Sequence, residues 1–262
     1  ETFDLAPFLH QGRNVLASTI WNFGQYKAVA QITSQTAFLL EGTSPGAEIA
    51  DTGKSWQVET DHGITIHPVT HSILKGFYAA EPIGVRSAED SDPDWDTTIR
   101  APAHWAQAVS LGEAASRGAR DSHSSWQLVP DLLPPMQSTL QSGGRVVRYS
   151  GLSATAGFPD GPITIPAHST ASVLLDNAHL TTAYPELVIG GGKGAIIRLT
   201  YAEALRDKNG QKGNRNDIAG KTISGVYDKY IADGSDKQIF TPLVWRTWRY
   251  LQIDVQTDNQ PL

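Results

Sequence analysis

The chain has 262 residues, 40% of them hydrophobic, so it is long enough to bury one or two cores and is not disordered throughout. Its 21 basic and 27 acidic residues give a net charge of -6, and the basic residues are scattered, which argues against nucleic-acid binding. The absence of cysteine excludes disulfides, thiolate metal ligands and a cysteine nucleophile.

Composition favours short strands over helices. The 24 glycines and 15 prolines are spread along the chain beside Thr, Val, Ile and Trp, which is typical of strands joined by tight turns. No window approaches the roughly 18 apolar residues of a membrane-spanning helix, so no membrane span is predicted. Because the chain opens with Glu1 and lacks a signal-peptide pattern, we expect a removed signal or an excised segment. An all-β fold is predicted.

The first 130 residues are interpreted as strands separated by turns. Val15–Trp21 is an apolar, β-branched run that is typical of a strand. Further strands are expected at Ala28–Ile32, Thr36–Leu40, Ser55–Glu59 and Ile64–Val69. Pro68 should end the last ladder or place it at a sheet edge. No fold is assigned to residues 76–125, where one alternative is a short helix around His104–Ala115.

A stiff connector follows. Pro130, Pro134 and Pro135 push the residues before them toward an extended backbone. Few tertiary contacts usually cross such a segment, so we place the domain boundary there. The predicted organisation is two antiparallel β-sandwich modules joined by a Pro-rich linker: residues 1–130, linker 131–145, and residues 146–262.

Six strands are expected in the second module, which is enough for a sandwich. They are Arg145–Tyr149, Ala171–Leu175, Leu187–Ile189, Ala195–Tyr201, Ile223–Tyr230 and Thr247–Gln256. In the last strand, alternation assigns Leu251, Ile253 and Val255 to the core. The opposite face would then carry Trp248, Tyr250, Gln252 and Asp254.

Three motifs near the C-terminus carry a family resemblance. They are YAEAL at Tyr201–Leu205, GNRNDIAG at Gly213–Gly220 and WRTWRYLQI at Trp245–Ile253. Together they resemble the accessory β-sandwich that precedes the catalytic barrel of bacterial α-L-rhamnosidases, and residues 190–262 match its concanavalin-like module most closely. Residues 2–26 resemble the latter part of the N-terminal sandwich of these enzymes, so the first module is expected to be incomplete at its N-terminus. Residues 126–136 resemble the linker.

The resemblance implies a parent enzyme that removes terminal α-L-rhamnose from glycans or glycosides with inversion. Its general acid and base lie in an α/α barrel, and no position here corresponds to them, so no catalytic residue is predicted. The expected partners are the catalytic barrel of the same polypeptide and a rhamnose-containing carbohydrate. The enzyme class favours a periplasmic or extracellular location. The segment alone should be inactive; the alternatives are a carbohydrate-binding module or a surface scaffolding protein.

Two sets of site residues are proposed from the sequence. Sugar rings stack on exposed aromatic side chains, and the best candidates for exposure are Trp21, Tyr26, Trp248 and Tyr250. Glu203 has the parity of core residues, so a structural ion pair with Arg249, or alternatively Arg246, is favoured over a catalytic acid.

No cofactor is predicted, with calcium left open as a ligand. Alternate carboxylates in residues 90–96 would suit calcium, but the EF-hand pattern is absent and a solvated turn around Trp95 is favoured. Residues 213–217 would serve a metal, a sugar or simply a polar hairpin loop. A zinc site at His67 and His71 is rejected because Pro68 opposes a helix there.

Overall fold

The computed structural model describes residues 2–29, 31, 35–74, 80–97, 105–122, 124, 126–134, 136–155 and 157–262. Their regular structure consists of β-strands and three short 3-10 helices, η1 (Ala6–Phe8), η2 (Gly24–Tyr26) and η3 (Ala47–Ala50). No α-helix occurs in these ranges, and no helix in them has the length and hydropathy needed to cross a bilayer. The predicted all-β class is confirmed.

The chain divides into two compact units whose segments interleave in sequence. The first contains Glu1–Ile20, Ser34–Thr60 and Asp94–Leu140, and the second contains Trp21–Thr33, Asp61–Pro93 and Gln141–Leu262. The second unit therefore recruits two segments from the first 130 residues. The division into modules at 1–130 and 146–262 with a linker at 131–145 stays a prediction.

The first unit holds little regular structure. Strand β1 (Gln57–Val58) pairs antiparallel with β4 (Ala106–Gln107), and β5 (Ala115–Ser116) pairs parallel with β6 (Gln127–Leu128). The expected strands at Val15–Trp21 and Thr36–Leu40 are wrong, because their backbones join no ladder. The helix considered around His104–Ala115 is also wrong over residues 105–115, while His104 itself lies outside the described residues.

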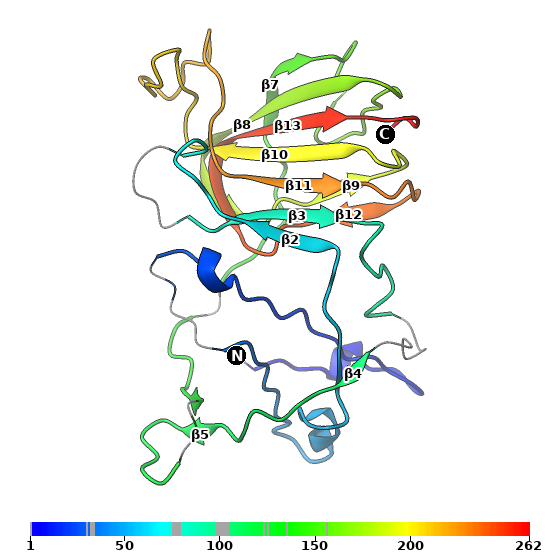
Figure 1. Ribbon diagram of the computed structural model, residues 1–262, viewed down its shortest axis with the longest axis vertical. Coiled ribbons are helices and arrows are strands. Elements are labelled where there is room, and N and C mark those ends of the chain that lie inside the picture. The colour runs from blue at the N-terminus through cyan, green and yellow to red at the C-terminus, as the bar shows by residue number, and fades with distance from the viewer. Residues whose placement is uncertain are drawn as a thin grey trace. The chain divides into compact units, whose positions relative to one another are not determined.

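The second unit is built on a seven-stranded sheet with the order β2-β3-β11-β10-β13-β8-β7 (Figure 1). Only the β11–β3 pair is parallel; the other neighbours are antiparallel. The strands are β2 (Ile64–His67), β3 (Ile83–Ser87), β7 (Arg145–Ser150), β8 (Thr170–Ala183), β10 (Ile196–Ala202), β11 (Tyr227–Ile231) and β13 (Arg246–Gln256). Strand β2 ends directly before Pro68 and lies at the sheet edge, as expected from the missing N–H of proline.

A smaller antiparallel pair, β9 (Leu187–Ile189) with β12 (Gln238–Phe240), supplies the second layer. Ile189 and Phe240 from this pair belong to one buried cluster with residues of the large sheet, among them Val173, Ile197 and Leu199. Burial of these apolar side chains away from water is the main stabilising term of the sandwich. The second unit thus has one face of its main sheet covered by a hydrophobic core.

A β-bulge in β8, opposite β13, accompanies a change in the alternation expected for β13. Leu251, Ile253 and Val255 are buried in the core, as predicted. The register with β8 shifts between Trp248 and Tyr250, where residues 177–180 of β8 stand opposite Arg249 alone, and Trp248 lies in the same core cluster. Tyr250 belongs instead to a second cluster. The prediction that Trp248 and Tyr250 share one face of the strand is wrong.

Candidate functional site

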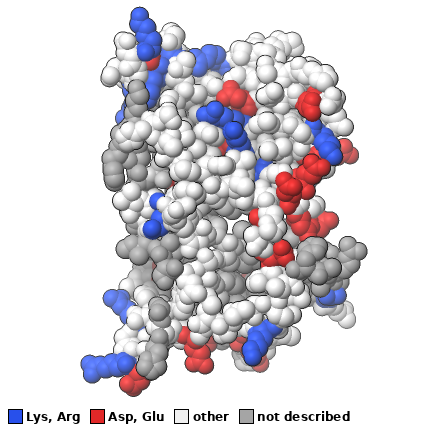
Figure 2. Space-filling view, in the orientation of Figure 1, with Lys and Arg blue, Asp and Glu red and all other residues white. Residues whose placement is uncertain are grey.

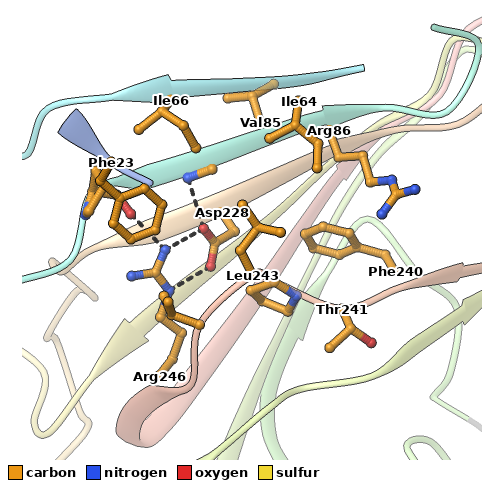
Figure 3. A pocket seen from close by; sticks show the side chains of 14 residues that line it. Phe23, Ile64, Ile66, Val85, Arg86, Asp228, Phe240, Thr241, Leu243 and Arg246 are labelled. Atoms are coloured by element: carbon orange, nitrogen blue, oxygen red, sulfur yellow. Dashed lines mark hydrogen bonds and ion pairs between the residues drawn. The ribbon is translucent and has the colours of Figure 1, made fainter. Parts of the chain in front are cut away.

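A buried ion pair forms the polar centre of the second unit (Figure 3). Arg246, the first residue of β13, donates from Nε to Asp228 Oδ2 at 2.8 Å and from Nη2 to Asp228 Oδ1 at 2.6 Å. Nη2 also donates to the Pro82 carbonyl oxygen at 2.8 Å, and the Gly84 N–H donates to Asp228 Oδ1 at 3.0 Å. Each charge therefore has a partner and additional hydrogen bonds, as buried charges require.

The cavity beside this pair is small and largely apolar (Figure 3). Its volume is about 20 Å³, which is room for about one water molecule. Phe23, Ile64, Ile66 and Phe240 are among its lining side chains. Asp228 is the one carboxylate in that lining, and both of its oxygens are already hydrogen-bonded. The arrangement suits a structural anchor and has no room for a sugar.

Glu81 is a group that the sequence reasoning missed. Burial raises the pKa of its carboxyl above the ordinary value, and the nearby charge of Arg246 only partly offsets this effect. Its Oε2 atom is buried and has no hydrogen-bond partner. The signal available in sequence was weak: a single acidic residue directly before Pro82 and the apolar start of β3. Glu81 has the raised pKa that a general acid needs, although an opposed carboxylate is also required.

The structure forms different ion pairs from the one predicted for Glu203. Glu203 lies just after the end of β10, where strand alternation no longer applies, and its side chain is 44% exposed. It accepts a hydrogen bond from Lys212 Nζ at 3.1 Å. Arg249 instead pairs with Asp176, with 3.0 Å between Nε and Oδ1. The predicted Glu203–Arg249 pair is therefore wrong. The alternative partner, Arg246, forms its ion pair with Asp228.

Asp176 is held in its charged form. Burial alone would raise the pKa of its carboxyl, but the hydrogen bond from Arg249, that from the Ala178 N–H, and the charges of Arg249 and Arg145 outweigh burial. The net effect lowers the pKa of Asp176. A carboxyl with a lowered pKa cannot serve as a proton donor near neutral pH.

The polar loop between β10 and β11 is organised around an internal ammonium group. Lys221 Nζ donates to the carbonyl oxygens of Lys212 and Asn214, both at 3.0 Å, and lies 3.4 Å from Asp217 Oδ2. The Lys221 side chain is only 9% exposed. Asn214 and Asp217 belong to the segment for which a metal or sugar was considered, and here their oxygens contact the lysine cation. Of the alternatives for residues 213–217, this favours the polar loop.

The acidic run at residues 90–96 forms turns. Asp90, Asp92, Asp94 and Asp96 are exposed, while Trp95 is half-buried, as a solvated turn would have them. In the part of the chain with described coordinates, no group of three or more His, Asp or Glu side chains is placed to hold a metal ion. The calcium alternative stays a prediction.

The four aromatic residues predicted to bind sugar separate into two classes. Trp21 is 38% exposed and Tyr26 is 37% exposed, so sugar binding by these two stays a prediction. Trp248 is 6% exposed and Tyr250 is 0% exposed, and the Tyr250 hydroxyl donates to the Arg215 carbonyl oxygen at 2.7 Å. Because the rings of Trp248 and Tyr250 are buried, a sugar cannot stack on them.

A polar groove lies on the sheet face opposite the main core. Ladder registers place Arg198 across from Asp254 and Thr200 across from Gln252, with Ser172 beyond Asp254 on β8. The groove has a volume of about 260 Å³. It is lined by Ser72, Ile73, Arg198, Thr200, Ile223, Ser224, Gly225, Gln252 and Asp254. This groove is larger than the cavity beside Arg246 and is the better candidate for a small ligand.

Charge on the molecular surface is dispersed. On the face drawn in Figure 2, basic and acidic side chains form small separate groups with uncharged surface between them. The residues drawn in colour there form no continuous basic stripe.

A comparison with protein-family models supports the family resemblance for the C-terminal part of the chain. Residues 167–261 match the model of the bacterial alpha-L-rhamnosidase concanavalin-like domain, which confirms the resemblance for this segment. A crystal structure of a GH78 family rhamnosidase of Bacillus sp. GL1 aligns at 20% identity with a TM-score of 0.27, over 36% of this chain and 9% of that one. The chain thus spans a small part of that enzyme's length. The search of curated proteins gave no match.

Proposed function

Because residues 167–261 match the rhamnosidase concanavalin-like domain and the surrounding fold is all-β, we propose that this chain is an accessory, non-catalytic segment of an α-L-rhamnosidase. The parent enzyme hydrolyses terminal α-L-rhamnose from glycans or glycosides with inversion. Its catalytic α/α barrel belongs to the same polypeptide, outside residues 1–262, and the sandwich braces it. The domain match is the observation that carries this proposal.

The chemistry of the described carboxylates supports an accessory role. Inverting hydrolysis requires two carboxyl groups roughly 6.5–9.5 Å apart, one with a raised pKa. Each of the two cavities has a single carboxylate in its lining, Asp228 in one and Asp254 in the other. Asp228 forms an ion pair with Arg246, and Asp254 accepts hydrogen bonds from Ser172 and Gln252. Neither cavity therefore offers a pair of opposed acids.

The test is turnover of p-nitrophenyl α-L-rhamnoside by residues 1–262. We expect no release of p-nitrophenol above the blank. Glu81→Gln, which removes the carboxyl with the raised pKa, should then give the same baseline. Turnover that is present in the unmodified chain and lost in Glu81→Gln would show that this segment carries its own catalytic acid, and the accessory role would be abandoned.

The alternative of a carbohydrate-binding module loses its original basis, because Trp248 and Tyr250 are buried. A sugar-binding role for the second unit therefore has to rest on residues other than Trp248 and Tyr250.

A further inference from the structure

We propose that the polar groove on the open face of the main sheet binds a pyranose sugar through a pair of adjacent hydroxyl groups. The groove belongs entirely to the second unit. Its volume of about 260 Å³ is just below the usual range of ligand pockets, which suits one sugar ring better than a larger ligand. Binding of this kind is separate from hydrolysis and does not depend on the proposed function.

The polar residues of the groove form a regular array. One row across the sheet reads Ser172, Asp254, Arg198 and Lys229, and the next reads Leu174, Gln252, Thr200 and Tyr227. Side chains at directly opposed ladder positions point to the same face. Apart from Leu174, which is buried in a second hydrophobic cluster, these positions present polar side chains to one face, and the other face of the same strands belongs to the main hydrophobic core.

Opposite charges face each other in this array without neutralising each other. Arg198 and Asp254 are ladder partners, yet they form no ion pair. The Arg198 guanidinium instead stacks on Tyr227, with 3.8 Å from Cζ to the ring centroid. Its Nε atom is buried without a hydrogen-bond partner. A buried donor without a partner is costly, so the site gains free energy when an acceptor arrives.

The acceptor side of the groove is held in place. Ser172 Oγ donates to Asp254 Oδ1 at 2.7 Å, and Gln252 Nε2 donates to both Asp254 oxygens at 2.9 and 3.1 Å. These bonds fix the carboxylate while leaving capacity, because each carboxylate oxygen has more than one acceptor direction. The Asp254 side chain is therefore oriented before a ligand binds, which lowers the entropy cost of binding.

A vicinal diol matches this arrangement. Each sugar hydroxyl donates one hydrogen bond and accepts others, so one hydroxyl donates to Asp254 while its neighbour accepts from Arg198. Ile73 and Ile223 provide apolar surface in the same lining for the C–H groups of the ring. Gly225 in the same lining lies close to the backbone of β10, where a Cβ would overlap the Tyr201 carbonyl group. The ligand class is accordingly a neutral pyranose and not an anion, because a fixed carboxylate lies in the lining.

The experiment is an NMR titration of ¹⁵N-labelled residues 1–262 with L-rhamnose at millimolar concentrations. We expect amide shifts centred on residues 198–200, 224–225 and 252–254. Tetrahydropyran-2-methanol, which has the ring without adjacent hydroxyls, should leave these amides unmoved. Shifts centred elsewhere, for example at Trp21 and Tyr26, no shifts, or an equal response to both compounds would overturn the proposal.

Two variants address the residues themselves. Asp254→Asn keeps the shape and removes the charge, so the dissociation constant should rise about tenfold, since a hydrogen bond to a charged group contributes that order. Asp236→Asn is the same change at an exposed position outside the groove, and it should leave the dissociation constant unchanged. Thr200→Val is the second test if Asp254→Asn does not fold. Unchanged affinity in the folded variants contradicts the site. The titration reads binding alone, so its failure leaves the accessory role standing.

Discussion

Arg246 and Asp228 join two strands that are not neighbours. Arg246 lies on β13 and Asp228 on β11, with β10 between them in the sheet. The same guanidinium reaches the carbonyl oxygen of Pro82, which directly precedes β3. One side chain therefore ties the C-terminal strand to a segment 164 residues earlier. This explains how residues of the first half of the chain are held in the sheet of the second unit.

Removing one partner of this pair should destabilise the second unit strongly. Asp228→Asn leaves the Arg246 charge buried at 6% exposure without its counter-ion. We expect a loss of roughly 3–5 kcal/mol in the free energy of unfolding. Urea denaturation followed by fluorescence measures it. Glu89→Gln, which breaks the exposed pair with Lys193, is the control and should barely move the midpoint. Equal effects of the two substitutions would refute the anchoring role.

Glu81 should lower stability at neutral pH. Its pKa is raised in the folded state, so the folded protein favours the protonated form. The contribution of Glu81 to stability is fully present below the pKa that this carboxyl has in the unfolded chain, near the ordinary 4.5. The contribution is lost as the pH rises through the raised pKa of the folded state. Glu81→Gln should therefore be more stable than the parent at pH 7, and the difference should vanish in acid. Thermal unfolding across this pH range checks the sign.

Asp176 should show the opposite pH dependence. Its pKa is lowered in the folded state, so its contribution is present above the ordinary aspartate value of 3.8 and is lost as pH falls through the lowered value. Asp176→Asn should destabilise at pH 7, because Arg249 then loses its partner. The difference in stability between the variant and the parent should disappear when the pH falls below 3.8. A gap that widens in acid would contradict this assignment.

Lys221 should control the order of the loop between β10 and β11. Lys221→Met removes the ammonium that holds the carbonyl groups of Lys212 and Asn214, at an expected cost of about 1–3 kcal/mol. Hydrogen exchange of peptides covering residues 206–222 should become faster. Lys208→Met, a matched change at an exposed position of the same loop, should leave exchange unchanged. Similar exchange in both variants would mean that the loop is ordered by other contacts.

The two classes of tryptophan should differ in their effect on stability. Trp248→Ala removes a ring that is 6% exposed and packs 5.6 Å from the Tyr201 ring centroid, so we expect a loss of about 3–5 kcal/mol. Trp21→Ala removes a ring that is 38% exposed and should cost far less. Chemical denaturation of the two variants side by side measures the difference, and comparable losses would argue against the bulge that buries Trp248.

Strand positions in the second unit were predictable because period-two burial is a local signal. Leu251, Ile253 and Val255 alternate with polar residues and lie in the core as expected. The register shift before Tyr250 was not predictable, since extra residues in the partner strand β8 leave no mark in the local spacing of β13. The recruitment of β2 and β3 was likewise missed, because pairing across long sequence separations leaves no trace in local spacing.

The ion pairs show the same limit. Glu203 has core parity only while the strand continues, and β10 ends at Ala202. Sequence identified the need for a cation near a buried acid, yet the structure assigns Arg249 to Asp176 and Arg246 to Asp228. The groove escaped detection because its residues come from two strands and two connecting segments, and none of them forms a motif. The spacing of apolar residues thus predicts which side chains are buried, whereas the partners of polar side chains depend on the register between strands.

The most direct test of the central claim compares two proteins in one assay. Release of p-nitrophenol from p-nitrophenyl α-L-rhamnoside is measured for residues 1–262 and for the full-length product of the same gene, at equal molar concentration. The account predicts turnover by the full-length protein and none by residues 1–262. An inactive full-length protein, or equal turnover by both, would contradict it.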